Sequence, residues 1–558
     1  MGILELNLEN GLYLGIDFGT TNSVVSIYNA DTDEIQTIPI DGSNIFPTAI
    51  QFEPDPDDES KLMRVFGVQA KEAAIIYPQS TVLSVKRLFG NKNKIAITVE
   101  GKEFSFTPEQ IAGEILSYMK QRAEEYVQDE LGVFTEFNGC VITVPANSTD
   151  KQKKVTKKAA VLAGFDEDSV YLRLEPAAAS ISYAIGETAD KKVLIYDFGG
   201  GTFDACILEV CSSMVAEPNI TILSTYGDND LGGNDIDKII MDMVYEEFKQ
   251  ITGGEIDLFN FDADDGVSVR SKKIAHIRLL QASNQAKERL SKARSTKLIL
   301  APFVQEPKIV NINMEITRED FYKHKRVNML DDSPETFEKF KNKSINDIID
   351  ITFGCVDSCM KAAGITSDQI DEIFLVGGSS SIALIGERIE EKFGKAPFRS
   401  RISPALSISQ GAAYYCNMIT SPLEKRISVN ERTVHPIGLE ISGRRFLEVV
   451  RRGMDIPSSG LTVEAGELLM TNFDDATSMA IIVYENAQST AGILPATVNE
   501  EGMKRLGGTS LRGIPQNKKG AERVKVIFNI SQDNMLKVTA SSTSTAGAVT
   551  ELSVDEMY

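Results

Sequence analysis

The stretch YLGIDFGTTNSVV, residues 13–25, sets Asp17 at the end of an apolar run and follows it with a glycine and several hydroxyl side chains. The same change occurs at Asp197 in VLIYDFGGGTFDACILEV, residues 193–210, and in part in IFLVGGSSSIALIG, residues 373–386. An apolar run that passes into a glycine turn is typical of a strand that ends at a ligand site. The repeated strand–turn–strand unit, with helices between the copies, predicts two similar α/β lobes facing across a cleft.

Four glycine turns supply the chemistry expected in that cleft: GTT at 19–21, GGGT at 199–202, LGG at 231–233 and GGSS at 377–380. Glycine lets backbone N–H groups approach a ligand with no Cβ in the way, which suits phosphate oxygens. The acids beside these turns would repel phosphate unless a divalent cation intervened, so Asp17 and Asp197 indicate Mg²⁺ held through water. A single turn of this kind is more often only a hairpin or a helix entry, so the interpretation depends on the repetition.

The length of the chain and its net charge indicate how many domains to expect and which partners are excluded. A chain of 558 residues exceeds what one hydrophobic core usually serves, and a net charge of −22 argues against partners such as nucleic acid or an anionic membrane. No apolar run approaches the roughly 18 residues that span a bilayer. The start, MGILELNLENG, lacks the features of a signal peptide, which favours the cytoplasm. The six cysteines and three histidines show no zinc-site spacing, so buried free thiols are expected.

Helix and strand signals divide the chain. Thr107-Pro108-Glu109-Gln110 is a capping box that predicts a helix over 108–131. A second helix is predicted over about 150–163, with a solvated face of lysines: Lys153, Lys154, Lys157 and Lys158. After about residue 420 the chain alternates between short strands and turns. We therefore expect an α/β domain over 1–420, a linker over 421–432 and a β-sandwich domain over 433–558.

The motifs resemble the actin-like ATPase superfamily and, in detail, the seventy-kilodalton heat-shock chaperones of the DnaK type. GIDFGTTNSVV, YDFGGGTFD and LVGGSSSI are similar to that family's three phosphate signatures. Between and after them, in the family's order, come SVKRLFG (84–90), VITVPANSTDKQKKVTKKAAVLAGF (141–165), LRLEPAAASISYAIG (172–186) and GDNDLGGNDID (227–237). The resemblance covers nearly the whole chain. It implies an α/β actin-like ATPase fold with two duplicated lobes, followed by an all-β sandwich domain.

The resemblance also implies roles for single residues. The catalytic set would be Lys86, Glu175, Asp197, Thr202 and Asp204. Within it, Lys86 and Glu175 would orient the attacking water, and Asp204 would assist as an acceptor. Asp17 and Asp197 would position hydrated Mg²⁺. The nucleotide would contact Gly19, Thr20, Thr21, Asn22, Gly199, Gly200, Gly201, Gly232, Gly233, Lys287, Ser291, Gly377, Gly378 and Ser379.

Two further groups concern communication and clients. Pro145 and Lys153 would relay the nucleotide state between the lobes. Leu439, Ile441 and Ile482 are candidates for a peptide pocket, although their alternation fits a sandwich core more readily. The implied function is an ATP-dependent chaperone that uses ATP/ADP and Mg²⁺ and binds unfolded or extended hydrophobic polypeptide clients. J-domain and nucleotide-exchange co-chaperones are the implied partners.

The sequence departs from the family at the adenine end. Ser381 stands where an arginine normally stacks on the base, and Ala405 stands where the family has an aspartate. Asn284 and Glu288 replace a usual glutamate and a frequent basic residue. Loss of a stacked guanidinium costs on the order of 1 kcal/mol, so weaker or less selective nucleotide binding is expected.

Other departures concern coupling between domains. The family's apolar linker becomes SVNERTV at 428–434, and Tyr171 replaces an arginine that J-domains use. With no helical lid before Tyr558, we expect a lidless form with weak coupling. The alternative is a nucleotide-sensing adaptor that holds one dedicated partner and hydrolyses little ATP. A metabolite kinase of the same superfamily would leave the chain beyond residue 430 unexplained.

Overall fold

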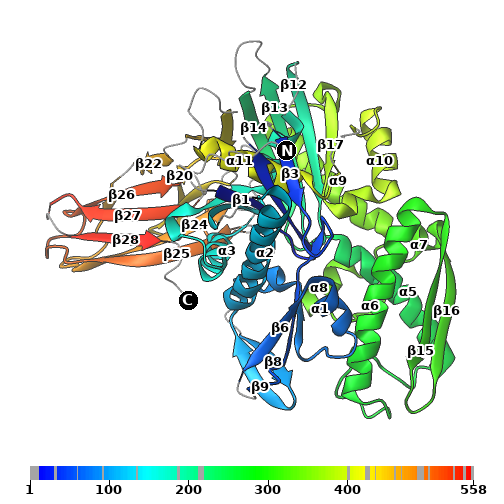
Figure 1. Cartoon of the computed structure of the whole chain (residues 1–558). Helices are drawn as coiled ribbons and strands as arrows, with labels where there is room; N and C mark the ends of the chain where they lie inside the picture. The colour runs from blue at the N-terminus through cyan, green and yellow to red at the C-terminus, as the bar shows by residue number, and fades with distance from the viewer. Residues whose placement is uncertain are drawn as a thin grey trace.

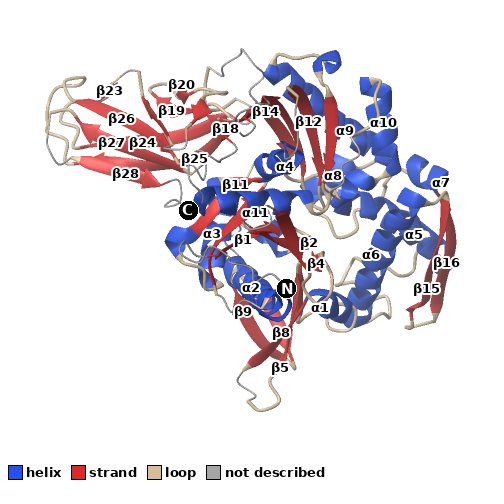
Figure 2. Ribbon diagram, turned by 45° about the horizontal axis from the view of Figure 1, so that its top comes forward, coloured by secondary structure: helices blue, strands red, loops and turns tan. Residues whose placement is uncertain are grey.

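The structure is a computed structural model of the whole chain. It describes residues 12–29, 34–58, 61–90, 94–132, 136–146, 148–184, 189–211, 219–398, 403–420, 428–433, 435–457, 460–466, 468–486, 496–500, 503–531, 535–544 and 548–553. Helices and sheets gather in one part of the molecule, and a body made almost wholly of strands projects to one side of it (Figures 1 and 2).

Two sheets repeat one arrangement. The first has the order β11 (Val170–Leu174), β10 (Phe137–Val144), β1 (Leu12–Phe18), β2 (Asn22–Asn29), β3 (Glu34–Ile38), with β4 (Phe46–Pro47) on β2. The second has the order β17 (Glu372–Val376), β12 (Lys191–Phe198), β13 (Phe203–Cys211), β14 (Asn219–Asp228), β18 (Ser428–Arg432), β21 (Asp455–Ile456). In both, the strand that carries the turn aspartate pairs antiparallel with the next strand and parallel with a later one. The duplication expected from the Asp17 and Asp197 motifs is therefore present in the strand pairing.

Helices cover these sheets and smaller sheets extend them. The helices are α1 (Gly67–Ala73), α2 (Pro108–Leu131), α3 (Asp150–Leu162), α4 (Glu175–Ala184), α5 (Gly233–Thr252), α6 (Val269–Lys292), α7 (Arg318–Lys323), α8 (Pro334–Phe340), α9 (Ile345–Ala363), α10 (Ala383–Phe393) and α11 (Ser407–Thr420). Short 3₁₀ turns are η2 (Val85–Leu88), η3 (Glu167–Ser169), η4 (Ser367–Gln369) and η5 (Gly378–Ser381). The small sheets are β6 (Leu62–Phe66), β5 (Ala49–Pro54), β7 (Thr81–Leu83); β8 (Ile95–Val99), β9 (Lys102–Phe106); and β15 (Ser295–Val304), β16 (Val310–Thr317).

Both helices predicted from the sequence, over 108–131 and about 150–163, are confirmed. Thr107 and Gln110 form the reciprocal capping box at the start of α2, and Gly132 ends the helix in the left-handed region at φ 70°. Helix α3 also begins with a capping box. The solvated lysine face predicted for α3 is wrong at one position, because the Lys153 side chain is buried. The β-sandwich lies against that side of α3, a long-range contact that helical periodicity does not reveal.

The strand-rich region after residue 433 has its own hydrophobic core. Its sheets are β20 (Arg445–Val450), β19 (Ile437–Ile441), β24 (Ser478–Asn486), β25 (Met503–Arg512), and β22 (Leu461–Glu464), β26 (Arg523–Ile530), β27 (Leu536–Ser542), β28 (Val549–Ser553), with β23 (Leu469–Met470) on β26. The short strands predicted after about residue 420 are present, among them β19, β20, β24, β26 and β27. Side chains from both sheets, such as Val483 and Phe528, fill one core whose buried residues run from Leu439 to Leu552.

The predicted linker is in part a strand. Residues 421–427 lie outside the described residues, whereas β18 adds a parallel strand to the edge of the second sheet, with Ile220 opposite Val429. Strand β21 pairs with the other side of β18. The segment therefore contacts the second lobe through backbone pairing, which needs no apolar side chain, and the weak coupling expected from its polar sequence stays a prediction.

The cysteines and the helix lengths bear on two further expectations from the sequence. Cys140, Cys206, Cys359 and Cys416 are buried free thiols, whereas Cys211 is exposed and Cys355 is half-buried. No helix in the described part of the chain has the length and apolar character needed to cross a membrane.

Candidate nucleotide site

The phosphate turns of the two lobes meet face to face. Thr20 and Thr21 come from the turn after β1, and Gly200 and Gly201 come from the turn after β12. A Cβ added to Gly200 would lie 2.4 Å from Oγ1 of Thr21, and one added to Gly201 would lie 3.1 Å from Oγ1 of Thr20. The two glycine turns therefore form one surface at the base of the cleft, where only glycine leaves room for the opposing hydroxyls.

Three carboxylates lie beneath this surface. Asp17 and Asp197 occupy equivalent positions near the ends of β1 and β12, and Asp204 sits opposite Asp197 across the β12–β13 hairpin. Burial, and then the negative charge of Glu175, raise the pKa of Asp17 to about 7. The same two causes, in the same order, hold the pKa of Asp197 and of Asp204 well above the usual range. Three buried carboxyl groups that lie close together favour the binding of a cation.

A buried ion pair joins Lys86 and Glu175, two of the residues predicted to be catalytic. Nζ of Lys86, in η2, donates to Oε1 of Glu175 at 3.0 Å, and their side chains are only 11% and 9% exposed. Ser84 at φ 56° turns the chain into η2, and Glu175 begins α4 directly after β11. The positive charge of Lys86 opposes the rise in the pKa of all three aspartates. The pair therefore lies within electrostatic reach of the acids.

A cavity of about 260 Å³ opens beside these groups and is lined by both lobes. Thr20, Lys86, Pro145 and Thr202 contribute to its walls. Arg87 also lines it, and its Nη2 lies 3.8 Å from Oδ2 of the buried Asp235. The sequence reasoning missed Arg87, although the residue stands next to Lys86 in the quoted segment SVKRLFG, because nothing local distinguishes it from a surface arginine.

The adenosine-side residues also converge. Nζ of Lys287 donates to the Gly233 carbonyl at 3.0 Å and pairs with Asp237 at 2.9 Å. A Cβ on Gly233 would lie 2.1 Å from Oγ of Ser379, so α5, α6 and η5 meet at this point. Ser291 donates back to the Lys287 carbonyl, one turn earlier on α6. The remaining predicted contacts sit on the same turns: Gly19, Asn22, Gly199, Gly232, Gly377 and Gly378.

Two buried oxygens bear on whether Mg²⁺ and a nucleotide fit. Oγ1 of Thr21 and Oδ2 of Asp197 are buried without a hydrogen-bond partner in the described residues, and unsatisfied groups of this kind call for a ligand. The donors are hard oxygens, which Mg²⁺ prefers. Across the described chain no three acid, histidine or cysteine side chains gather closely enough to hold a metal directly. The donor set fits a Mg²⁺ ion held largely through water.

The relay candidates lie on two neighbouring cavities. Pro145 lines the phosphate cavity, whereas Lys153 lines a second cavity of about 240 Å³ between the lobes and the β-sandwich. Ser148 and Asn229 line both cavities. The two candidates are therefore connected through shared walls, a placement that the sequence motif alone did not reveal.

The three residues predicted to form a peptide pocket differ in their burial. Leu439 has no exposed surface and lies in the sandwich core, so its assignment to a peptide pocket is wrong. Ile441 and Ile482 are half-buried and stay predictions. The sequence reasoning missed three exposed apolar side chains around β23: Leu468, Met470 and Phe473, exposed by 37%, 53% and 75%. Turn residues separate these three side chains in the sequence, so they do not form the alternation of apolar and polar residues from which strands were predicted.

A comparison with protein families agrees with this geometry. The family model described as Hsp70 protein matches residues 13–557, which is nearly the whole chain. The match spans the phosphate turns, the ion pair of Lys86 with Glu175, the adenosine-side residues and both sheets of the sandwich.

Proposed function

Because the chain belongs to the Hsp70 family, whose members are in general ATPases with a chaperone-type role, we propose that it is an ATP-dependent molecular chaperone. The family implies an actin-like ATPase fold with a C-terminal β domain. Its members in general bind ATP or ADP with Mg²⁺ and act on unfolded client polypeptides. The observation that carries the proposal for this chain is the buried pair of Lys86 with Glu175, set against two facing aspartate turns.

The chain's own residues would act by positioning. Lys86 places a fixed positive charge where charge develops on the terminal phosphate, and Glu175 keeps the ammonium oriented. Thr202 presents a hydroxyl from the turn that faces Thr20 and Thr21. Asp204, with its raised pKa, accepts a proton more readily than an ordinary aspartate does. Slow hydrolysis follows, because even such a carboxylate is a weak base toward water, so most of the catalysis comes from positioning and charge stabilisation.

Asp17 and Asp197 would hold the hydrated Mg²⁺, which neutralises phosphate charge when it is bound. The buried Oδ2 of Asp197 and the raised pKa of Asp17 support this assignment, since a cation would relieve both.

Clients would bind to the sandwich. An extended peptide can pair its backbone with a sheet edge while an apolar side chain enters a pocket. Met470 and Phe473 offer exposed apolar surface for such a side chain, together with the half-buried Ile441 and Ile482.

One observation favours the adaptor alternative. Ser381 is exposed and too short to stack on a base, and Ala405 brings no carboxylate to the adenine end. A protein that only senses nucleotide does not need to bind the adenine base tightly. The Lys86–Glu175 pair would then contribute to nucleotide binding without turnover.

Single-turnover hydrolysis of ATP by the full chain, with and without a panel of apolar peptides, tests the proposal. Slow Mg²⁺-dependent cleavage together with peptide binding in the micromolar range is expected. Nucleotide binding with no cleavage over many hours would favour the adaptor instead.

A further inference from the structure

Arg87 follows Lys86 in η2 and lies where the phosphate turns of the two lobes meet. A Cβ added to Gly201 would lie 3.4 Å from Nε of Arg87 and 3.1 Å from Oγ1 of Thr20. Arg87, Thr20 and Gly201 also line the phosphate cavity together. The guanidinium therefore belongs to the same surface as the two phosphate turns.

The phosphate cavity differs in its lining from the adenosine side of the site. Lys86 and Thr202 line it, whereas the described residues of its wall do not include Lys287 or Ser379. A group that faces this cavity is therefore placed to meet the phosphates of a nucleotide and not its base.

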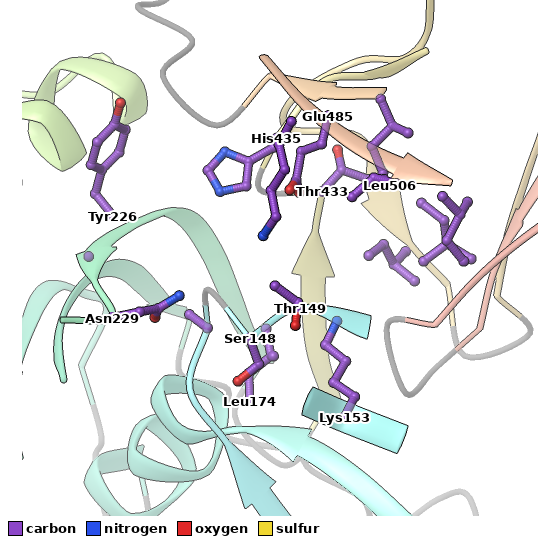
Figure 3. Close-up of a pocket in the computed structure, with 17 residues that line it drawn as sticks. Ser148, Thr149, Lys153, Leu174, Tyr226, Asn229, Thr433, His435, Glu485 and Leu506 are labelled. Carbon is purple, nitrogen blue, oxygen red and sulfur yellow. The ribbon is translucent and has the colours of Figure 1, made fainter. Parts of the chain in front are cut away.

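The described walls of the phosphate cavity come from the two lobes alone. Ser148 and Asn229 are shared with the second cavity, whose opposite side is formed by the sandwich. Figure 3 shows Ser148 and Asn229 on the side of the second cavity that lies away from His435 and Glu485. A contact between Arg87 and a ligand in the phosphate cavity therefore does not depend on the sandwich.

The Arg87 guanidinium has a charged neighbour but forms no hydrogen bond with a described residue. Its Nη2 lies 3.8 Å from Oδ2 of Asp235 in α5, which is longer than a hydrogen bond. The same oxygen accepts from the backbone N–H of Gly232 at 2.8 Å and so already caps the start of α5. Because the Arg87 side chain is 38% exposed, an ion pair at this distance contributes little free energy. The side-chain N–H groups of Arg87 are therefore available to a ligand.

We propose that the guanidinium of Arg87 binds the terminal phosphate of ATP, and that this contact makes the site prefer ATP to ADP. The inference rests on the proposed function, because it takes ATP as the ligand of the site. A guanidinium can donate two parallel hydrogen bonds to phosphate oxygens, whereas the Lys86 ammonium acts as a point charge. ADP lacks the third phosphate, so a group that reaches only that phosphate contributes to the binding of ATP alone.

Asp235 competes with the phosphate for Arg87. Its side chain is buried, burial raises its pKa, and Arg87 is the first of the positive charges that oppose the rise. The carboxylate attracts the guanidinium toward α5, so Arg87 must leave this neighbour to bind phosphate. Loss of the carboxylate charge should therefore strengthen ATP binding. If Arg87 and Asp235 served only to hold the two lobes together, loss of either charge would have the same effect.

The test compares the dissociation constants of Mg²⁺-ATP and Mg²⁺-ADP for the full chain, obtained by rapid mixing before ATP is cleaved. Arg87→Gln should weaken ATP binding at least tenfold and ADP binding by less than twofold. Arg87→Lys keeps the charge but not the paired donors, and it should weaken ATP binding about threefold. The exposed Arg270, which does not line the cavity, provides the matched control Arg270→Gln, which should leave both constants unchanged.

Asp235→Asn separates phosphate binding from a structural role. It keeps an acceptor for the Gly232 N–H and should tighten ATP binding about threefold, an effect opposite in sign to that of Arg87→Gln. If both variants weaken ATP binding, or if Arg87→Gln changes ATP and ADP binding by the same factor, the inference is overturned. A wild type that binds ATP without cleaving it would defeat the proposed ATPase activity, and the same binding constants would still decide the role of Arg87.

Discussion

The phosphate end and the adenine end of the candidate site are built in different ways. At the phosphate end, main-chain turns from both lobes touch, and a Cβ on Gly200 would lie 2.4 Å from the Thr21 hydroxyl. At the adenine end, side chains on α6 and η5 supply the surroundings, and the exposed Ser381 leaves space where a longer side chain would reach. A surface made of backbone tolerates few substitutions, whereas one made of side chains can change while the fold is kept.

This difference predicts where substitutions have the largest effects. In the proposed mechanism, groups at the phosphate end act on developing charge in a buried setting, where one well-placed donor is worth several kcal/mol. A cation stacked on a base at a partly exposed site contributes only about 1 kcal/mol. Effects should therefore decrease from the phosphates to the base and then to the domain boundary.

The largest effect is expected for Lys86→Ala. Turnover should fall at least about 100-fold, because the fixed charge beside the phosphates is lost, while nucleotide binding should weaken much less. Single-turnover cleavage and equilibrium titration of ATP measure the two quantities separately.

Removal of Lys86 also leaves the buried Glu175 carboxylate unpaired, which destabilises a protein by about 3 kcal/mol or more. The double variant Lys86→Ala/Glu175→Gln removes that charge and should recover stability without recovering turnover. The exposed Lys297 provides the surface control Lys297→Ala. Undiminished cleavage by Lys86→Ala would remove this residue from the mechanism.

Thr202→Ala should have the next largest effect. Its hydroxyl lies on the turn that faces the first lobe, so its loss should slow cleavage by about 10-fold to 30-fold with little change in the dissociation constant of ATP. Rapid-quench measurement of the chemical step decides the point. Equal cleavage constants for the two proteins would show that the hydroxyl takes no part in the chemistry.

The phosphate end could be predicted because its signals are local. Each of the Asp17 and Asp197 motifs contains its own strand, turn and acid within about a dozen residues, and their repetition predicted two lobes. Capping boxes fixed the start of α2 in the same way. These features depend on neighbours in the sequence, which the chain alone displays.

Features that depend on distant contacts were not predicted. The burial of Lys153 needs the sandwich, which begins about 280 residues later in the sequence. The alternation of β19 is shared by core and pocket residues, so it could not assign Leu439 to the core. The pairing of β18 with β14 is made by backbone N–H and C=O groups. Every residue carries both groups, except that proline lacks the N–H, so the amino-acid sequence does not reveal this pairing.

At the adenine end, discrimination between ATP and GTP should be small, and ATP should bind more weakly than it does in typical family members. Ser381→Arg should tighten ATP binding about fivefold, the value of one stacked guanidinium at a partly exposed site. Calorimetric titration of both nucleotides against both proteins measures this. Nanomolar affinity of the wild type for ATP, with much weaker binding of GTP, would contradict this prediction and show that other residues bind the adenine base.

The smallest effect is expected at the domain boundary. Saturating peptide should change ATP turnover by less than about threefold, which is a coupling free energy below about 0.7 kcal/mol. The pairing of β18 does not by itself oppose this value, because coupling requires that the docking free energy differ between nucleotide states. Strand β18 pairs with Asn219–Thr221, at the opposite end of β14 from Asp228, so the docked segment lies at the end of this strand away from the glycine turn at 231–233.

Val429→Pro sharpens this last expectation, since proline removes one backbone donor from the centre of the β14–β18 pairing. If docking is equally strong in all nucleotide states, the variant should lower the melting temperature while the response of turnover to peptide stays below threefold. ATP should also change peptide affinity by less than threefold, and peptide should change ATP affinity by the same factor, because coupling of binding free energies is reciprocal. Tenfold stimulation by peptide in the wild type, lost in Val429→Pro, would show instead that the edge strand is the element through which the two sites communicate.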